Sequence, residues 1–207
     1  MVETRSRFSY YDRLSAKNKA IYRRGDAVTH VAFPEGAGLQ TELRVAAAAV
    51  AQALDAGKPS LVRAQAQKIC DLITSSLGTE QVTVKVLRVR PQRSFGELHG
   101  LYTRDDGAEP TLRVWMRTAQ RADVVKPRTF LRTLVHELCH HLDYAHYRLG
   151  ESFHNPGFFR RESSLMRLLT PDGRAGAGVE ATAVAWAAGP SADAPSAAPD
   201  QLRLPGF

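Results

Sequence analysis

Two histidines one helical turn apart are the residues of this 207-residue chain that point most directly to chemistry. They belong to the run His136-Glu137-Leu138-Cys139-His140. If the run is helical, both imidazoles lie on one face of the helix and can reach the same zinc ion. Glu137, between them, can then accept a proton from a water that the metal activates. The spacing predicts zinc ligands at His136 and His140 and a general base at Glu137.

The apolar pattern around this run predicts that it is helical. At about 100° per residue, His136 and His140 share one face of a helix over 127–149. Apolar side chains gather on the opposite face, namely Leu131, Leu134, Val135, Leu138 and Leu142. Such a helix would pack through its apolar face and present both histidines from its polar face. His141 falls off the metal face and is expected to be a surface or hydrogen-bonding residue.

A catalytic zinc site needs a third protein ligand and an open fourth position. His154 is the first candidate, because it stands just before a second predicted helix, over 155–169. Asn155 can cap that helix and Pro156 can occupy its first position. A helix that turns back on the first one would bring His154 to the metal.

Two alternative third ligands stay open. His146 fits a spacing used by some zinc peptidases, but Asp143 stands where a glycine normally lets the helix end sharply. Glu162 fits the other common arrangement, a glutamate on the following helix. Asp143 and Tyr147 also share the histidine face, where Asp143 could orient a ligand imidazole and Tyr147 could contact a substrate oxyanion. The simpler interpretation makes both of them structural polar residues.

The elements that must position these residues divide into helices and strands. Helical spacing of apolar residues covers 39–56 and 60–77, and strand-like alternation covers 82–86, 95–102 and 111–118. The sequence therefore predicts an α+β fold with N-terminal helices, a small, mainly antiparallel sheet, the zinc-binding helix and a following helix with the third ligand. The strand with Arg113, Trp115 and Arg117 is either a substrate-aligning edge strand or internal to the sheet.

Composition divides the chain into three parts. Residues 1–34 form a basic, aromatic-rich N-terminal segment, residues 35–170 the metallopeptidase domain, and residues 171–207 an Ala/Pro/Gly-rich tail that is expected to be disordered. The N-terminal segment either grips single-stranded nucleic acid through its bases and aromatics, or packs its tyrosines on the domain while its bases face water.

Composition also excludes several classes of protein. Hydrophobic residues at 43% and charged residues at 24% are ordinary for a globular protein. Two cysteines cannot form a disulfide scaffold or a four-cysteine zinc ribbon. No segment is apolar enough for a membrane span or a secretory signal, so a cytoplasmic location is expected. The net charge of +7 makes nucleic acid a candidate partner.

The C-terminal residues carry an isolated apolar cluster, Gln201-Leu202-Arg203-Leu204-Pro205-Gly206-Phe207. Such a cluster at the end of a tail that is expected to be disordered often marks a docking peptide for another protein, although it can also have no role. Its Gln-Leu-x-Leu core is similar to the peptides that bind the bacterial sliding clamp. The alternative is that the cluster folds back on its own domain.

The metal motif resembles that of the SprT-like (Spartan-like) zinc metallopeptidases. The resemblance rests on the His136–His140 run, on His154 about a dozen residues later, and on the aromatic Phe158 four residues after His154. The order of elements over about residues 40–168 is also similar. The resemblance implies a zinc peptidase with three histidine ligands, and family members that cut proteins crosslinked to DNA make DNA-associated proteins candidate substrates.

These observations favour a zinc-dependent metallopeptidase that acts on a protein or peptide. Zinc would activate water, and Glu137 would remove the water's proton and deliver it to the leaving amine. One alternative is a zinc hydrolase of a non-peptide substrate, since the motif specifies activated water rather than the bond. Another is a DNA-associated binding module with a structural zinc, which a fourth protein ligand would indicate.

Overall fold

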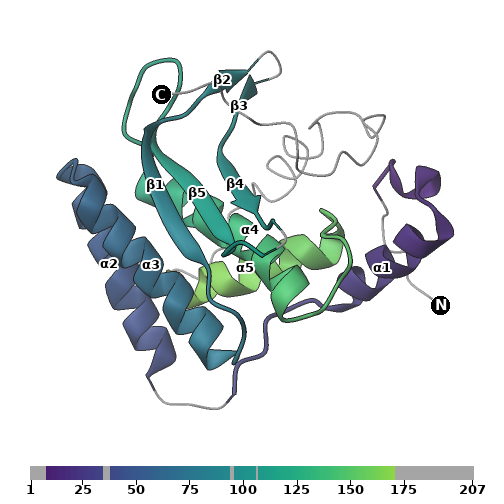
Figure 1. Ribbon diagram of the computed structural model, residues 1–207. Coiled ribbons are helices and arrows are strands. Elements are labelled where there is room, and N and C mark those ends of the chain that lie inside the picture. The colour runs from purple at the N-terminus through teal and green to yellow at the C-terminus, as the bar shows by residue number, and fades with distance from the viewer. Residues whose placement is uncertain (1–7, 35–37, 94–95, 106, 171–207) are drawn as a thin grey trace.

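The computed structural model describes residues 8–34, 38–93, 96–105 and 107–170 (Figure 1). In chain order its elements are η1 (Tyr11–Arg13), α1 (Ala16–Ala27), α2 (Leu39–Asp55), α3 (Pro59–Ser76), β1 (Thr83–Val89), β2 (Gln92–Arg93), β3 (Gly96–Glu97), β4 (Gly100–Thr103), β5 (Thr111–Arg117), α4 (Pro127–Ala145) and α5 (Pro156–Leu169). The predicted tail over 171–207, with its docking peptide, lies outside the described residues. Within the described part of the chain, no helix is both long and apolar enough to cross a membrane.

The main sheet has three strands in the order β1-β5-β4. β1 runs parallel to β5, with Val84 opposite Leu112, and β4 runs antiparallel to β5, with Gly100 opposite Val114. The predicted α+β class is confirmed, but the sheet is mixed where the sequence predicted mainly antiparallel pairing. Alternation of apolar and polar residues along a strand indicates which face of the sheet each side chain occupies. It does not indicate whether the neighbouring strand runs parallel or antiparallel.

The strand with Arg113, Trp115 and Arg117 is β5, which lies between two partners. Of the two interpretations of this strand, the internal one is therefore correct, and the edge of the sheet nearest α4 belongs to β4. The segment predicted as one strand over 95–102 is divided. β3 pairs with β2 in a separate two-stranded sheet, and β4 joins β5.

A single hydrophobic core joins the helices to the sheet. α2 packs along α3, α3 contacts β1, and α4 contacts β4 and β5. Figure 1 shows α2 and α3 side by side beside the sheet. The largest fully buried apolar side chains include Leu43, Leu54, Ile69, Ile73, Leu112, Leu134, Leu138, Leu142 and Phe158. Each such burial contributes about 1.5–3 kcal/mol, so the core fixes α4 firmly against the sheet.

The polar face of α4 is covered rather than presented to solvent. α5 packs against α4, and His136, Glu137 and Asp143 are buried along with the apolar residues of the helix. The predicted start of α5 is confirmed, because Asn155 Oδ1 accepts a hydrogen bond of 2.7 Å from the N–H of Phe158 and Pro156 is the first helical residue. Sequence periodicity showed which residues share a face but not that a second helix covers it.

The described part of the N-terminal segment, residues 8–34, packs on the domain. Tyr11 and Tyr22 are buried, and their rings meet edge to face with centroids 4.9 Å apart. Arg13, Lys17 and Arg23 face solvent. The segment therefore follows the second interpretation, in which tyrosines pack inward and bases face water. The sequence analysis did not anticipate that it contains the helix α1.

We predict that Gly157→Ala destabilises the protein, because α1 and α5 meet at this residue. A Cβ at Gly157 would lie 2.6 Å from the Asp26 Cα and the Gly25 carbonyl oxygen, which are backbone atoms that cannot rotate away. Urea denaturation should show a free energy of unfolding lower by about 1–3 kcal/mol. Gly150→Ala is the control, since its Cβ would meet only Ile21 Cδ1, at 3.4 Å. Equal stability of the two variants would contradict the prediction.

Candidate metal centre

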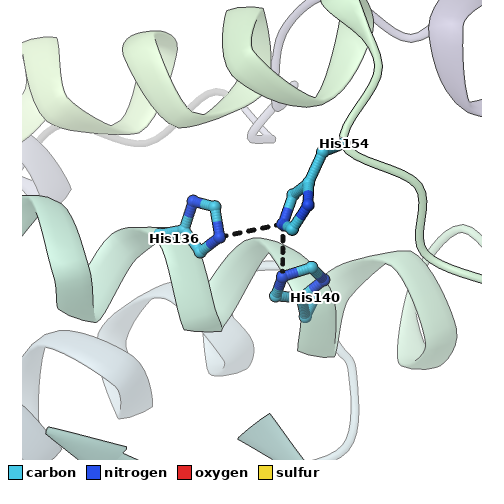
Figure 2. Close-up of side chains that lie close together, drawn as sticks. All are labelled: His136, His140 and His154. Carbon is cyan, nitrogen blue, oxygen red and sulfur yellow. Dashed lines mark hydrogen bonds between the residues drawn. The ribbon is translucent and has the colours of Figure 1, made fainter. Parts of the chain in front are cut away.

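Three histidine side chains converge between α4 and α5. His136 and His140 lie one turn apart on α4, and His154 comes from the loop before α5. The Nε2 atom of His154 lies 3.0 Å from Nε2 of His136 and 3.0 Å from Nε2 of His140 (Figure 2). Three nitrogen ligands of a tetrahedral zinc ion stand about 3.3–3.4 Å apart, given Zn–N bonds of about 2.0–2.1 Å. Small movements would therefore let these three residues hold a metal ion.

The two alternative third ligands lie elsewhere. His146 is the residue that ends α4, and it packs edge to face with Tyr147. Glu162 lies behind His136, where its Oε2 is 3.1 Å from the Nδ1 atom, on the side of the ring away from His154. The structure thus brings His154, rather than His146 or Glu162, together with the pair on α4.

Hydrogen bonds to the Nδ1 atoms assign the tautomers of the histidines on α4. His136 Nδ1 donates to the Glu162 carboxylate, whose other oxygen lies 3.4 Å from Arg132 Nε. His140 Nδ1 lies 2.7 Å from Ser152 Oγ, and the Ser152 hydroxyl itself donates to Asp143 over 2.7 Å. Ser152 must therefore accept the proton of His140 Nδ1. Both Nε2 atoms are left with lone pairs that point toward His154.

The surroundings of His140 and His154 favour their neutral forms. Burial lowers the pKa of His154 to about 3, with a further contribution from His136. Burial, followed by the neighbouring His154 and His136, also lowers the pKa of His140 well below its ordinary value. Neutral imidazole is the form that binds a metal ion. His140 and His154 are therefore in a metal-binding state at neutral pH.

Phe158 forms the apolar floor beneath the three imidazoles. Its ring centroid lies 5.0 Å from that of His136, 4.8 Å from that of His140 and 5.1 Å from that of His154. Phe158 is fully buried, so it leaves no room for solvent on that side of the cluster. Its position four residues after His154, on the first turn of α5, is the one that the sequence motif indicated.

Glu137 lies where α4 meets the edge strand β4. A Cβ at Gly100 would overlap Glu137 Oε1 and lie 2.7 Å from its Cγ, so only glycine allows this approach. Burial raises the pKa of Glu137 to about 7, against the lowering effects of His136 and of a hydrogen bond from the backbone of Tyr102. The carboxyl group is 4% exposed and can exist with or without its proton near neutral pH.

Asp143 is linked to a histidine of the cluster, whereas Tyr147 contacts Arg161. Asp143 reaches His140 through Ser152, and its other oxygen accepts a hydrogen bond of 2.7 Å from Arg161. Burial raises the pKa of Asp143 to about 6, although Arg161 and Ser152 lower it. Tyr147 places its ring 5.4 Å from the Arg161 guanidinium. Its contact with a substrate oxyanion stays a prediction.

Two other residues of α4 take the positions expected of them. His141 Nε2 lies 2.8 Å from the carbonyl oxygen of Glu80, and its Nδ1 lies 3.3 Å from the hydroxyl of Tyr102. Cys139 is buried in the core. His141 is thus a hydrogen-bonding residue that ties α4 to β4, and Cys139 is a packing residue.

Several residues of the site were missed by the sequence analysis. Ser152 and Arg161 were not singled out, and Glu162 was considered only as a ligand. A glycine inside a strand often marks the close approach of another group, so Gly100 could have indicated from the sequence that another residue packs against this strand. An arginine among the apolar positions of a predicted helix was a weaker signal for Arg161. Nothing in the local sequence distinguishes Ser152.

Comparisons with protein-family models, curated proteins and solved structures find no match for this chain. The resemblance to SprT-like peptidases stays a prediction from the motif.

We predict that His136→Ala, His140→Ala and His154→Ala each abolish stoichiometric metal binding. Each change removes one of three nitrogens that converge, and two imidazoles bind a divalent ion far more weakly than three. His146→Ala is the matched control and should bind metal like the wild type, because it lies outside the cluster. Metal content after gel filtration, measured by atomic emission, tests this. Metal loss in His146→Ala with retention in His154→Ala would contradict the assignment.

Proposed function

We propose that the protein is a zinc-dependent metallopeptidase. The observation that carries the proposal is the convergence of three imidazoles, two of which are kept neutral by burial, beside the carboxyl group of Glu137. Three protein ligands are the usual number in catalytic zinc sites, which keep one position open. Zinc bound there would activate a water molecule and polarise a carbonyl group. In the part of the chain that the structure describes, the cluster has three members, which favours this function over a structural zinc.

Glu137 is the proposed general base. Its carboxylate accepts a proton from the attacking water and delivers that proton to the nitrogen of the departing amine. A pKa near 7 suits both transfers, since neither the charged nor the neutral form is strongly preferred at neutral pH. The backbone N–H of Tyr102 holds the carboxylate at the edge strand β4. Glu137 thereby keeps a defined position.

The edge strand β4 supports a peptide as the substrate. β4 pairs with β5 along one edge and ends the order of the described main sheet. An extended peptide can add to such an edge through main-chain hydrogen bonds. Gly100 and Tyr102, which contact Glu137, belong to the same strand. A peptide bound to β4 would therefore lie beside the general base.

Proteins associated with DNA are the proposed substrate class. The support is the net charge of +7, which favours association with a polyanion, together with the resemblance of the motif to SprT-like peptidases. The test is to measure the cleavage of a DNA-binding protein with and without DNA, each at low and at moderate salt. Faster cleavage with DNA at low salt would distinguish DNA-associated substrates from peptides in general. Equal cleavage in all four conditions would remove the DNA-specific part of the proposal and leave the peptidase.

We predict that Glu137→Gln retains metal and loses peptide hydrolysis. The amide keeps the shape of the side chain but cannot take a proton from water, and general base catalysis contributes about 10²–10⁴-fold. Casein hydrolysis and metal content should be measured on the same preparations, with His146→Ala as the active control. Wild-type turnover in Glu137→Gln would contradict the role of Glu137. Turnover by the zinc-loaded wild type of an ester or amide substrate, but of no peptide, would favour the alternative of a non-peptide hydrolase.

We predict that Gly100→Ala retains metal and lowers turnover by about 10²-fold. The added methyl group must push the Glu137 carboxylate from its position, and displacements of about 1 Å can cost that much. Gly150→Ala, away from Glu137, is the control. Turnover equal to that of the control would show that the close approach of β4 does not position the base.

A further inference from the structure

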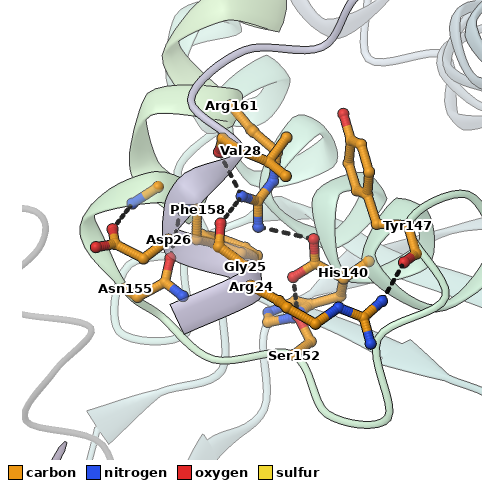
Figure 3. A network of polar contacts seen from close by, with 12 residues as sticks. Arg24, Gly25, Asp26, Val28, His140, Tyr147, Ser152, Asn155, Phe158 and Arg161 are labelled. Carbon is orange, nitrogen blue, oxygen red and sulfur yellow. Dashed lines mark hydrogen bonds and ion pairs between the residues drawn. The ribbon is translucent and has the colours of Figure 1, made fainter. Parts of the chain in front are cut away.

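Arg161 of α5 is the largest fully buried side chain among the described residues, with 1% of its surface exposed. Its Nη1 donates to the carbonyl oxygens of Gly25 and, over 2.7 Å, of Val28, at the C-terminal end of α1. Figure 3 shows Arg161 at Gly25 and Val28. Its Nη2 donates to Asp143 Oδ1 over 2.7 Å. The planar guanidinium thus joins the N-terminal segment to α4 with a geometry that lysine cannot reproduce.

A chain of hydrogen bonds leads from Arg161 to a candidate metal ligand. Asp143 Oδ2 accepts from Ser152 Oγ over 2.7 Å, and Ser152 Oγ accepts from His140 Nδ1 over 2.7 Å. Each donor in the chain points toward the Asp143 carboxylate, so the proton of His140 is held on Nδ1. The lone pair of Nε2 is thereby directed at the other two histidines. Partners of this kind orient ligand imidazoles and raise their affinity for metal.

The N-terminal segment also holds the loop that supplies His154. The hydroxyl of Tyr10 donates to the carbonyl oxygen of His154 over 2.9 Å, and Asn155 Nδ2 donates to the carbonyl oxygen of Tyr22 over 3.1 Å. The N–H of Gly157 donates to Asp26 Oδ1 over 2.8 Å. Residues 10–28 therefore contact the supports of two of the three histidines.

We propose that Arg161 is a positioning residue of the metal site, and that metal binding and the docking of residues 10–28 stabilise each other. The inference rests on the proposed metal site but not on the identity of the substrate. Arg161 fixes His140 through Asp143 and Ser152, and the carbonyl oxygens of Gly25 and Val28 fix Arg161. Because coupling between two binding events is reciprocal, metal must tighten the docking of α1 as much as docking tightens metal.

Cobalt(II) is the probe for the positioning role, because its visible spectrum reports ligand geometry and chelator competition gives its Kd. Arg161→Gln should bind cobalt about 10–100-fold more weakly than the wild type, with a changed spectrum. Arg160→Gln, the exposed neighbour on α5, is the matched control and should resemble the wild type. Wild-type affinity and spectrum in Arg161→Gln would overturn the proposal.

Ser152 variants keep the test decisive if Arg161→Gln does not fold, because they leave the buried pair of Arg161 and Asp143 intact. Ser152→Ala removes the hydroxyl between Asp143 and His140 and should weaken cobalt binding by about tenfold or more. Ser152→Thr keeps a hydroxyl and should restore most of the affinity. Equal cobalt affinity in the alanine and threonine variants would overturn the chain of positioning contacts.

Amide hydrogen exchange measures the reverse effect, namely how metal binding changes the docking of α1. Cobalt should slow amide exchange in α1 of the wild type, and the slowing should be smaller in Ser152→Ala. Tyr10→Phe, which removes only the hydrogen bond to His154, should lower cobalt affinity by about 2–10-fold. If cobalt binds but the rate of amide hydrogen exchange in α1 does not change, the coupling is overturned. A wild type that binds no metal would overturn the proposed function as well, whereas bound metal without these effects would overturn this inference alone.

Discussion

The structure depends on one electrostatic constraint, the convergence of three imidazoles at a buried position between α4 and α5. His136 and His140 both turn their Nε2 lone pairs toward His154, because Glu162 and Ser152 hold the protons on Nδ1. His154 Nε2 lies 3.0 Å from both atoms, so without a metal a single N–H of His154 is shared between two lone pairs, and burial removes the water that would otherwise bind them. A bound cation would accept a lone pair from each of the three imidazoles at once, which is the physical reason for interpreting the cluster as a metal site.

The elements around the site each supply one part of this arrangement. α4 carries two of the histidines and Glu137, and the core beneath it fixes its position against β4 and β5. α5 supplies Glu162 as the support for His136 and Phe158 as the floor. Two arginines, Arg132 and Arg161, lie against the carboxylates that support the histidines. Metal ligands, their supports and the compensating charges thus come from α4, α5 and the loop between them.

Sequence patterns were sufficient where the information is local. The helical spacing of His136 and His140 and the cap at Asn155 both depend on residues within one or two turns, and both agree with the structure. The strand direction of β1, the burial of the polar face of α4 and the docking of α1 depend on contacts between distant segments. Arg161, for example, bonds to Gly25 across 136 positions of the chain. No periodicity or motif records such a contact, so these features required the structure.

X-ray absorption at the zinc edge of the purified, zinc-loaded protein tests the central claim most directly. A site formed by His136, His140 and His154 predicts one zinc ion per chain, with three imidazole nitrogens and one solvent-derived oxygen at about 2.0–2.1 Å. The multiple-scattering signal of the imidazole rings would give the number of histidines. A sulfur ligand, a fourth protein ligand or the absence of bound zinc would contradict the account.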